Sequence, residues 1–357
     1  MFARNGCVDV DINCVHKIET DLKYGLIDNN YLYNHIIDVA KKNNVRFIMS
    51  KVHKIDNCNV FLEHNVLTAK IIIDGSGKHG PINSSFIDYT KGITIKKNYS
   101  LNSLNSFNNL YKQYFIGIKI KTNPHNIKNV ILIDKFVDDS CKTPSFGYII
   151  PYDDTTLLVE ETVLVAKYFD TCEYSVLLER LVKRLKNYNI TILEQIKVEV
   201  DSIPLNNHIP NNRGTHDSHT FPIGQAGNMI NNLSGYTLGY NIYHIPEFCD
   251  YIVSSNFNKA NAIQSYWNNK RRVINYINLV GLKMMYSFDA SELNEFQTQY
   301  FKYIAGTYNY KIMFLNCDYH NFNWFKLMWS FKNYIYFPSK YLLKIGRFIL
   351  YDWFKFC

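Results

Sequence analysis

The sequence predicts an α/β fold in which an antiparallel sheet lies between two segments that each join a strand to a glycine-rich turn. A helix and several short strands lead to the first turn, at residues 71–77. Alternating strands occupy much of residues 111–166. The second glycine-rich turn, at residues 221–236, leads into a helix.

The composition describes a globular chain without a strong charge. The chain has 357 residues, enough for two domains, and its net charge of +8 is spread along the sequence, which gives no support to nucleic-acid binding. The eight cysteines form no CxxC pair and no metal-ligand spacing with histidine, so we expect free thiols, a reducing compartment and no metal. We find no signal-peptide pattern and no uninterrupted run of about 18 apolar residues that would span a membrane.

The first part of the chain predicts a strand, a helix and a second strand. Cys7–Val15 alternates between polar and apolar residues, as a strand does. Asp28 is placed to cap a helix that follows it. The apolar residues with helical spacing in that helix are Leu32, Ile36, Ile37 and Ala40. We expect a strand at Val45–Ile48, followed by short strands that end in IIIDGSG.

The first candidate binding turn consists of Asp74, Gly75, Ser76 and Gly77. A strand that ends in a tight glycine turn is the arrangement by which α/β proteins place backbone N–H groups against a phosphate or a dinucleotide. A glycine-rich connection with a purely structural role has the same pattern.

Two adjacent carboxylates, Glu160 and Glu161, stand in an otherwise apolar strand, Leu157–Thr162. Alternation places their side chains on opposite faces of the sheet, so one can face solvent while the other faces an apolar interior. Burial raises the pKa of a carboxyl group, and a carboxyl that is neutral near pH 7 can donate a proton. The alternative is an edge strand with both carboxylates solvated or paired.

An amphipathic helix is expected at Tyr174–Tyr188, and a strand at Ile190–Val200. The helix carries its leucines on one face, and we expect Arg180, Lys183 and Arg184 on the opposite face.

The second candidate binding turn follows a short strand. Its residues are Gly224, Gln225, Ala226 and Gly227, and then Ser234, Gly235 and Tyr236. Glycine lets the backbone approach a flat or phosphorylated ligand closely, and the N-terminus of the following helix favours negative charge. A structural strand-to-helix connection is again the alternative.

The C-terminal part is expected to be helical, and Phe322–Phe356 combines many aromatic residues with lysine and arginine. Such a segment fits a membrane interface, with its apolar face in the lipid and its cations at the headgroups. A helical cap packed on the core is the alternative.

In this order, the motifs YGLID, IIIDGSG, VEET, LEQIKVEVDSIPL and GQAG…SGY resemble those of the flavin-dependent lycopene cyclases, particularly the bacterial type. The resemblance extends from Tyr24 to about Ile242 and more loosely into the C-terminal part. It is carried most specifically by VEET and by GQAG…SGY.

The resemblance implies a hydroxylase-like FAD/NAD(P)-binding flavoprotein fold with an antiparallel substrate sheet and a helical tail. Both glycine-rich turns would contact FAD. The resemblance implies four units: residues 1–82 and 201–260 form the two parts of the FAD-binding domain, residues 83–200 form the sheet domain, and residues 261–357 form the helical region. Glu160 matches the family's catalytic carboxylate, with Glu161 as its partner. The implied reaction is the redox-neutral cyclisation of linear lycopene end groups to β-rings.

The same resemblance implies reduced FAD with NAD(P)H as its electron source, a lipophilic carotenoid substrate, and a cytoplasmic or organellar protein in peripheral contact with a membrane. The family's N-terminal GxGxxG unit has no counterpart in this sequence, so we expect an N-terminally truncated version of the fold that lacks its first βαβ unit. Two alternatives stay open: another FAD-dependent hydroxylase or prenyl reductase of this fold, and an inactive homologue that holds no flavin.

Overall fold

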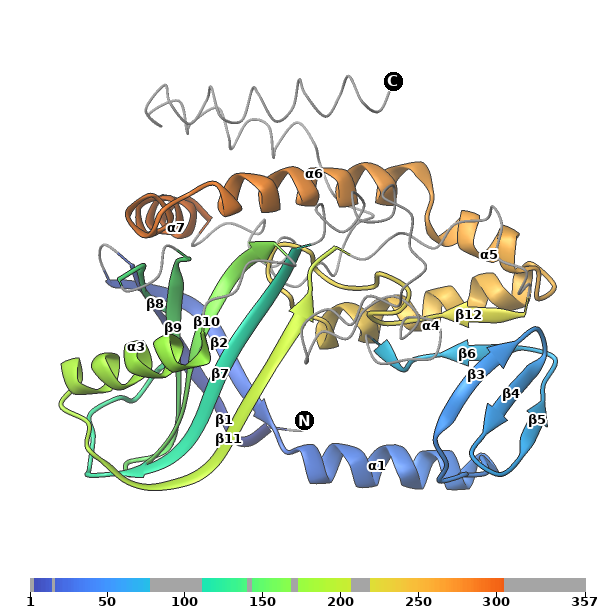
Figure 1. The fold of residues 1–357 in the computed structure, drawn as a ribbon, viewed down its shortest axis with the longest axis horizontal. Helices are drawn as coiled ribbons and strands as arrows, with labels where there is room; N and C mark the ends of the chain where they lie inside the picture. The colour runs from blue at the N-terminus through green and yellow to red at the C-terminus, as the bar shows by residue number, and fades with distance from the viewer. Residues whose placement is uncertain are drawn as a thin grey trace.

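The computed structural model describes residues 3–14, 17–77, 111–139, 143–167, 173–206 and 219–304. A large twisted sheet with helix α3 on one face stands at one end of the molecule, and helices α6 and α7 run across its top (Figure 1). Two smaller sheets and helices α4 and α5 form the other end. This mixed architecture of sheets followed by helices agrees with the predicted α/β class.

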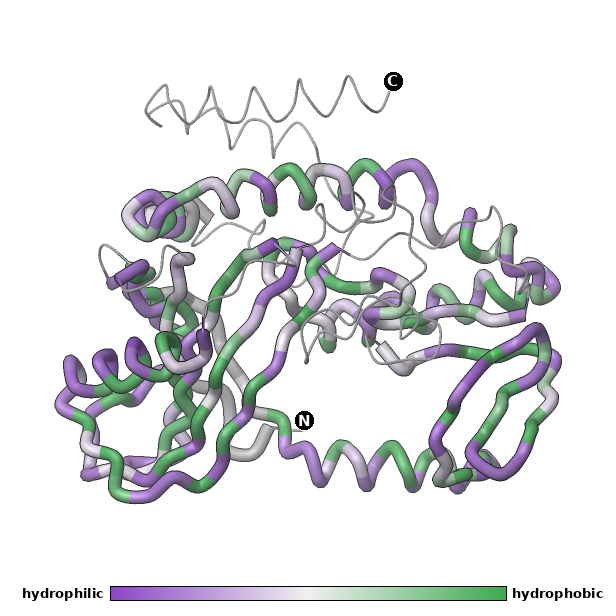
Figure 2. Tube along the Cα trace, in the orientation of Figure 1, coloured by the Kyte–Doolittle hydropathy of each residue, from purple (hydrophilic) through white to green (hydrophobic). Residues whose placement is uncertain are grey.

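The large sheet contains seven strands in the order β11-β7-β10-β9-β8-β1-β2. The strands are β1 (Ala3–Asn13), β2 (Lys17–Ile27), β7 (Tyr111–Thr122), β8 (Val130–Val137), β9 (Ser145–Asp153), β10 (Thr156–Lys167) and β11 (Ile192–Pro204). Neighbouring strands are antiparallel, except that β1 and β8 are parallel. Figure 2 shows hydrophilic and hydrophobic residues alternating along these strands, the pattern of a sheet whose two faces differ.

The expected 1–82 unit is divided in the structure. Its first two strands belong to the large sheet, where β1 lies between β8 and β2. A strand's place in a sheet depends on its partner, which lies more than 100 residues away in the case of β8, and alternation within the strand does not reveal that partner.

Helix α3 (Tyr174–Asn187) packs on the sheet through Leu177, Leu181 and Leu185, which are almost fully buried. The expectation that Arg180 and Arg184 lie on the opposite, solvent-facing side is wrong, because both are buried, with 4% and 6% of their surfaces exposed. A charged side chain can be buried when it forms hydrogen bonds or ion pairs with polar groups in the interior. The sheet beneath α3 provides such groups.

The smaller end of the molecule is built around a parallel strand pair. Strands β6 (Ile72–Asp74) and β12 (Thr220–Pro222) pair in parallel, and β3 (Val52–Asp56), β4 (Asn59–Leu62) and β5 (Val66–Thr68) form an antiparallel sheet. Helices α4 (Leu238–Ser254), α5 (Lys259–Tyr266) and α6 (Asn269–Tyr286) share an apolar core with β12. Helix α7 (Ala290–Ile304) packs with the end of α6 against the large sheet.

Helix α1 (Asn29–Lys42) begins where the sequence predicts. The Asp28 carboxylate accepts hydrogen bonds from the N–H groups of Asn30 and Tyr31, at 3.0 and 3.1 Å, which confirms its capping role. The strand expected at Val45–Ile48 is wrong: residues 45–50 have no regular structure and are exposed. A strand is stabilised by hydrogen bonds to a neighbour, and residues 45–50 pair with none of the described strands.

Within the described ranges, no helix has both the length and the apolar character needed to cross a bilayer. The aromatic and basic segment Phe322–Phe356 lies outside the described residues.

Candidate active site

The carboxylates of Glu160 and Glu161 lie on opposite faces of strand β10, as alternation predicts. The residues paired directly with Glu160 on the adjacent strands are Gly117 on β7 and Tyr148 on β9. Gly117 also pairs with Glu199 on β11. Directly paired residues of antiparallel strands project to the same face. Glu160, Tyr148 and Glu199 therefore stand in one row, and the position between the two carboxylates is a glycine.

The side chain of Glu160 occupies the space that Gly117 leaves. A Cβ atom at position 117 would lie 3.0 Å from Glu160 Cγ, so any larger residue would displace this carboxylate. Burial, and then the negative charge of Glu199, raise the pKa of Glu160 from 4.5 to about 7. Among the described residues Glu160 makes no ion pair. A substantial fraction of Glu160 is therefore protonated near neutral pH.

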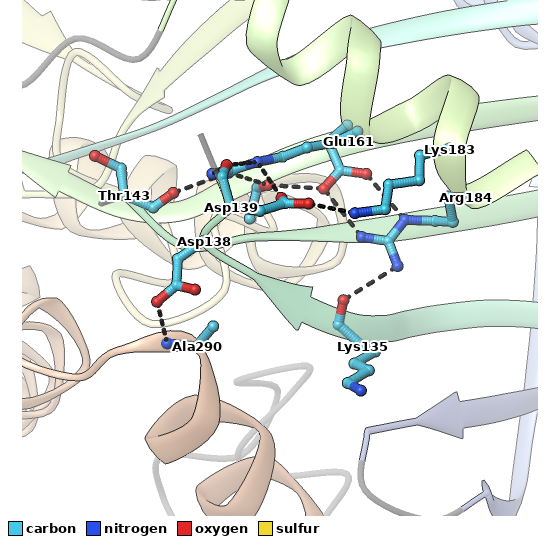
Figure 3. Close-up of polar contacts among 10 residues, drawn as sticks. Lys135, Asp138, Asp139, Thr143, Glu161, Lys183, Arg184 and Ala290 are labelled. Atoms are coloured by element: carbon cyan, nitrogen blue, oxygen red, sulfur yellow. Dashed lines mark hydrogen bonds and ion pairs between the residues drawn. The ribbon is translucent and has the colours of Figure 1, made fainter. Parts of the chain in front are cut away.

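Glu161 lies on the face that α3 covers, and it is fully buried. Its two carboxylate oxygens accept hydrogen bonds from Arg184 Nε and Nη2, at 2.9 and 3.0 Å (Figure 3). Ser145 donates a third hydrogen bond at 2.7 Å. Arg184 Nη1 also donates to Asp134, at 2.7 Å, and to the carbonyl of Lys135, at 3.1 Å. The structure thus pairs Glu161 with an arginine on the face opposite to Glu160. A role of Glu161 as the catalytic partner of Glu160, which the resemblance implies, stays a prediction.

Two opposing effects act on the pKa of Arg184. Burial disfavours the charged guanidinium, but the carboxylates of Glu161 and Asp134 outweigh burial and raise the pKa of Arg184. Gly147 pairs with both Glu161 and Asp134 and makes room for Arg184, whose side chain a Cβ atom at that position would overlap. Strand β10 is fixed against α3 by these contacts, and the orientation of Glu160 on the other face follows from them.

The two glycine-rich turns come together although about 150 residues separate them in the sequence. They follow the ends of the parallel strands β6 and β12, where Asp74 accepts a hydrogen bond from the N–H group of Ile223 at 2.9 Å through its backbone oxygen. A Cβ atom at Gly77 would lie 3.3 Å from Gln225 Oε1. The carboxyl ends of adjacent parallel strands are where open α/β sheets bind ligands.

The conformation of each turn requires glycine. Gly77, Gly224 and Gly235 have φ angles of +68°, +59° and +75°, in the left-handed region that residues with a Cβ atom rarely adopt. At Gly227, a Cβ atom would lie 2.5 Å from the carbonyl oxygen of Pro222. One carboxylate oxygen of Asp74 accepts from the N–H group of Ser76 at 3.0 Å, and its other oxygen is buried without a described partner.

The second turn links this end of the molecule to the large sheet. A Cβ atom at Gly235 would lie 2.5 Å from Gln113 Oε1, at the beginning of β7. Leu233 packs on the same apolar cluster as Tyr148, the neighbour of Glu160. The helix expected after Ser234–Gly235–Tyr236 is α4. Ala226 lies in the same turn as Gly224 and Gln225. The described contact of the second turn with the sheet is at Gly235, beside Gln113, which lies on the face of β7 that also carries Gly117.

A separate cavity of about 550 Å³ lies at the other end of β7 and contains none of the predicted site residues. Its lining includes Asn13, His125 and Tyr188. The side chains that sequence analysis missed at the candidate site are Tyr148, Arg184 and Glu199, together with the gap at Gly117. Alternation in LEQIKVEV places Glu199 on one face of a strand, but the register that sets it beside Gly117 is absent from the local sequence.

The match to the family model described as lycopene cyclase protein covers residues 7–308, which is most of the chain. This chain belongs to the lycopene cyclase family. The predicted resemblance is confirmed over a longer range than the motifs span.

Named relatives of the chain are carotenoid enzymes of plants. Capsanthin/capsorubin synthase from Citrus sinensis is 23% identical over 253 residues, which is 66% of this chain and 46% of the relative. Neoxanthin synthase from Solanum tuberosum is 21% identical, covering 68% and 48%. Lycopene beta cyclase from Arabidopsis thaliana is 22% identical, covering 66% and 46%. The chain therefore spans about half the length of these curated relatives.

A solved structure confirms the fold. A geranylgeranyl bacteriochlorophyll reductase-like protein from Thermoplasma acidophilum superposes with a TM-score of 0.60 at 10% identity, covering 96% of this chain and 84% of that one. The predicted hydroxylase-like α/β fold is thus confirmed, at a level of identity that shows the fold alone.

Proposed function

We propose that this chain is a carotenoid cyclase that converts the linear ψ end groups of lycopene to β-rings. The observation that carries the proposal is Glu160, a buried carboxyl with a pKa of about 7, on the sheet face that Gly235 of the second turn meets at Gln113. Membership of the lycopene cyclase family and the similarity to lycopene beta cyclase from Arabidopsis thaliana support the substrate.

In this proposal Glu160 transfers its proton to a terminal double bond of the substrate. The O–H bond breaks, a C–H bond forms, and the neighbouring double bond attacks the resulting carbocation to close the ring. Loss of a ring proton to a base then leaves a neutral product, so no net oxidation or reduction occurs. General acid catalysis of this kind is efficient when the pKa of the acid lies near the working pH.

The residues of both glycine-rich turns fit a flavin cofactor. The positive-φ glycines allow close approach of a flat or phosphorylated group, the N-terminus of α4 follows the second turn, and one buried oxygen of Asp74 lacks a described partner. We propose that both turns hold FAD: residues 74–77 and 224–227, with Ser234, Gly235 and Tyr236. Bound reduced FAD would supply an electron-rich ring that favours a positive transition state, with NAD(P)H as the source of electrons.

An oxygenated carotenoid is a second candidate substrate. The specific observation is that capsanthin/capsorubin synthase is as similar to this chain as lycopene beta cyclase, at 23% and 22% identity. The same carboxyl would act as the proton donor. Feeding both substrate classes to the purified chain and identifying the products by chromatography separates the two.

Two further alternatives have distinct signatures. A hydroxylase or prenyl reductase of this fold would consume NAD(P)H in step with oxygen uptake or substrate reduction, whereas a cyclase would not. An inactive homologue that holds no flavin would be purified without a bound yellow chromophore. We also propose peripheral contact with a membrane, in the cytoplasm or an organelle, because a carotenoid substrate dissolves in lipid; flotation with vesicles tests this contact.

Glu160→Gln tests the proposed catalytic role. In carotenoid-producing cells, this variant should abolish cyclised product at an unchanged protein level, because an amide cannot donate the proton. The matched control is Glu194→Gln, on the same sheet but exposed and paired with Lys121 at 3.6 Å. Full activity in Glu160→Gln would contradict the role.

A further inference from the structure

Each face of the large sheet carries a row in which a glycine separates two carboxylates on neighbouring strands. Under α3, Gly147 lies between Glu161 and Asp134. On the opposite face, Gly117 lies between Glu160 and Glu199. In both rows the missing side chain opens the space between two acidic residues.

The two rows differ in what neutralises them. Arg184 lies over Gly147 and binds both carboxylates of its row. The space over Gly117 is instead occupied by Glu160 itself, whose Cγ comes within 3.0 Å of the glycine's Cβ position. Burial disfavours the charged form of Glu160, and a like charge across the glycine disfavours it further.

The cation near the second row is bound to Glu199 alone. Lys197, two residues earlier on β11, forms an ion pair with Glu199, and both side chains are largely exposed. Hydrogen bonding to Glu199, and then its charge, raise the pKa of Lys197. Glu199 therefore has a cationic partner, whereas Glu160 makes no ion pair among the described residues.

Tyr148 on β9 lies directly beside Glu160. The other charged and titratable groups that register places on this face are farther along β7, β9 and β11, and they are Lys119, Tyr152 and Asp201. The amino group of Lys119 lies 4.1 Å from the centre of the Tyr152 ring. Glu199 is the group directly across Gly117 from Glu160.

We propose that Glu199, and not Glu161, is the functional partner of Glu160: together with burial, its negative charge across Gly117 keeps the proton on Glu160 until the substrate takes it. Glu199 is a positioning residue, since it acts through Glu160. This inference rests on the proposed function for its consequence in catalysis, but the coupling of the two carboxyls is a property of the protein alone.

Infrared difference spectroscopy of the full chain tests the coupling directly. The carboxyl band that disappears in Glu160→Gln identifies Glu160, and its pH titration gives the midpoint. In Glu199→Gln we expect this midpoint to fall by about one pH unit, which is about a tenfold loss of protonated Glu160 at pH 8. In Lys197→Met it should rise, because the charge of Glu199 is then unopposed. Glu194→Gln should leave it unchanged.

Activity provides a second readout. The basic limb of the pH–activity profile should shift to lower pH in Glu199→Gln and to higher pH in Lys197→Met. Lowering the pH should restore the activity of Glu199→Gln. An unchanged midpoint in both variants overturns the proposal, even if the wild type cyclises lycopene. If the wild type shows no cyclisation but the midpoint moves as expected, the coupling stands and the proposed function fails.

Discussion

The acidity of Glu160 is set by its surroundings in the folded protein and not by its position in the sequence. Glu160 shares its strand with Glu161, yet burial and the charge of Glu199 raise its pKa to about 7, whereas Glu161 pairs with Arg184. The chemical difference between the two glutamates comes from the faces of the sheet on which they lie.

The raised pKa of Glu160 predicts a pH-dependent contribution to stability. Its pKa is about 7 in the folded protein and 4.5 as an unperturbed group, so the folded state binds more protons between these values. The contribution of Glu160 to the free energy of unfolding is therefore fully present below about pH 4.5. It is lost as the pH rises through 7, and the total loss is about 3 kcal/mol. Urea unfolding at pH 5 and pH 8 should show this decline in the wild type beyond that in Glu160→Gln. Equal declines in the two proteins would contradict the raised pKa.

At the scale of elements, helix α3 is joined to the sheet by a buried ion-pair network as well as by leucines. The guanidinium of Arg184 connects strand β10 to β8 through Glu161 and Asp134, and Tyr188 donates to Asp134 at 2.9 Å. A network of this kind fixes the register of a helix on a sheet, because each donor has a single set of acceptors.

Removal of Arg184 should destabilise the protein strongly. Arg184→Met leaves the carboxylates of Glu161 and Asp134 buried without their cation, and we expect a loss of about 3–5 kcal/mol in the free energy of unfolding. Lys183→Met is the matched control, since Lys183 is exposed and its ion pair among the described residues is with Asp139 at the surface; it should change stability by less than about 1 kcal/mol. Urea denaturation of both variants measures the difference. Similar losses in the two variants would show that the buried network is unimportant.

At the scale of the whole molecule, the candidate site is assembled from parts that are distant in sequence. The β6 and β12 turns lie at one end, the sheet face at the other, and the Leu233–Gly235 segment contacts β7 and the sheet core. A ligand that binds both turns would therefore stabilise contacts between the two ends.

Added FAD should raise the stability of the whole chain. At about 100 times its Kd, a ligand that binds only the folded state adds about 2.7 kcal/mol to the free energy of unfolding. Gly224→Ala should weaken this effect, because the φ angle of +59° at that position disfavours a Cβ atom. Gly239→Ala is the control, since its Cβ would meet no atom within 4 Å. Thermal unfolding with and without FAD measures the shift; no shift in the wild type would contradict flavin binding.

Several features of the fold and site were predictable from the sequence because their causes are local. The cap at Asp28, the strand periodicity around Glu160 and the opposite faces of Glu160 and Glu161 depend on residues within a few positions. The glycine-rich turns were predictable for the same reason, since positive φ angles favour glycine wherever they occur.

Tertiary structure alone decided the partners. Strands β1 and β2 joined the large sheet, Val45–Ile48 formed no strand, and Arg180 and Arg184 turned inward toward buried acceptors. Glu199 reached Glu160 through the register of β11 on β7. The sequence by itself determined which residues could carry a proton or allow a tight turn, whereas pairing across the sheet decided which of them meet, because register and burial depend on segments far apart in the chain.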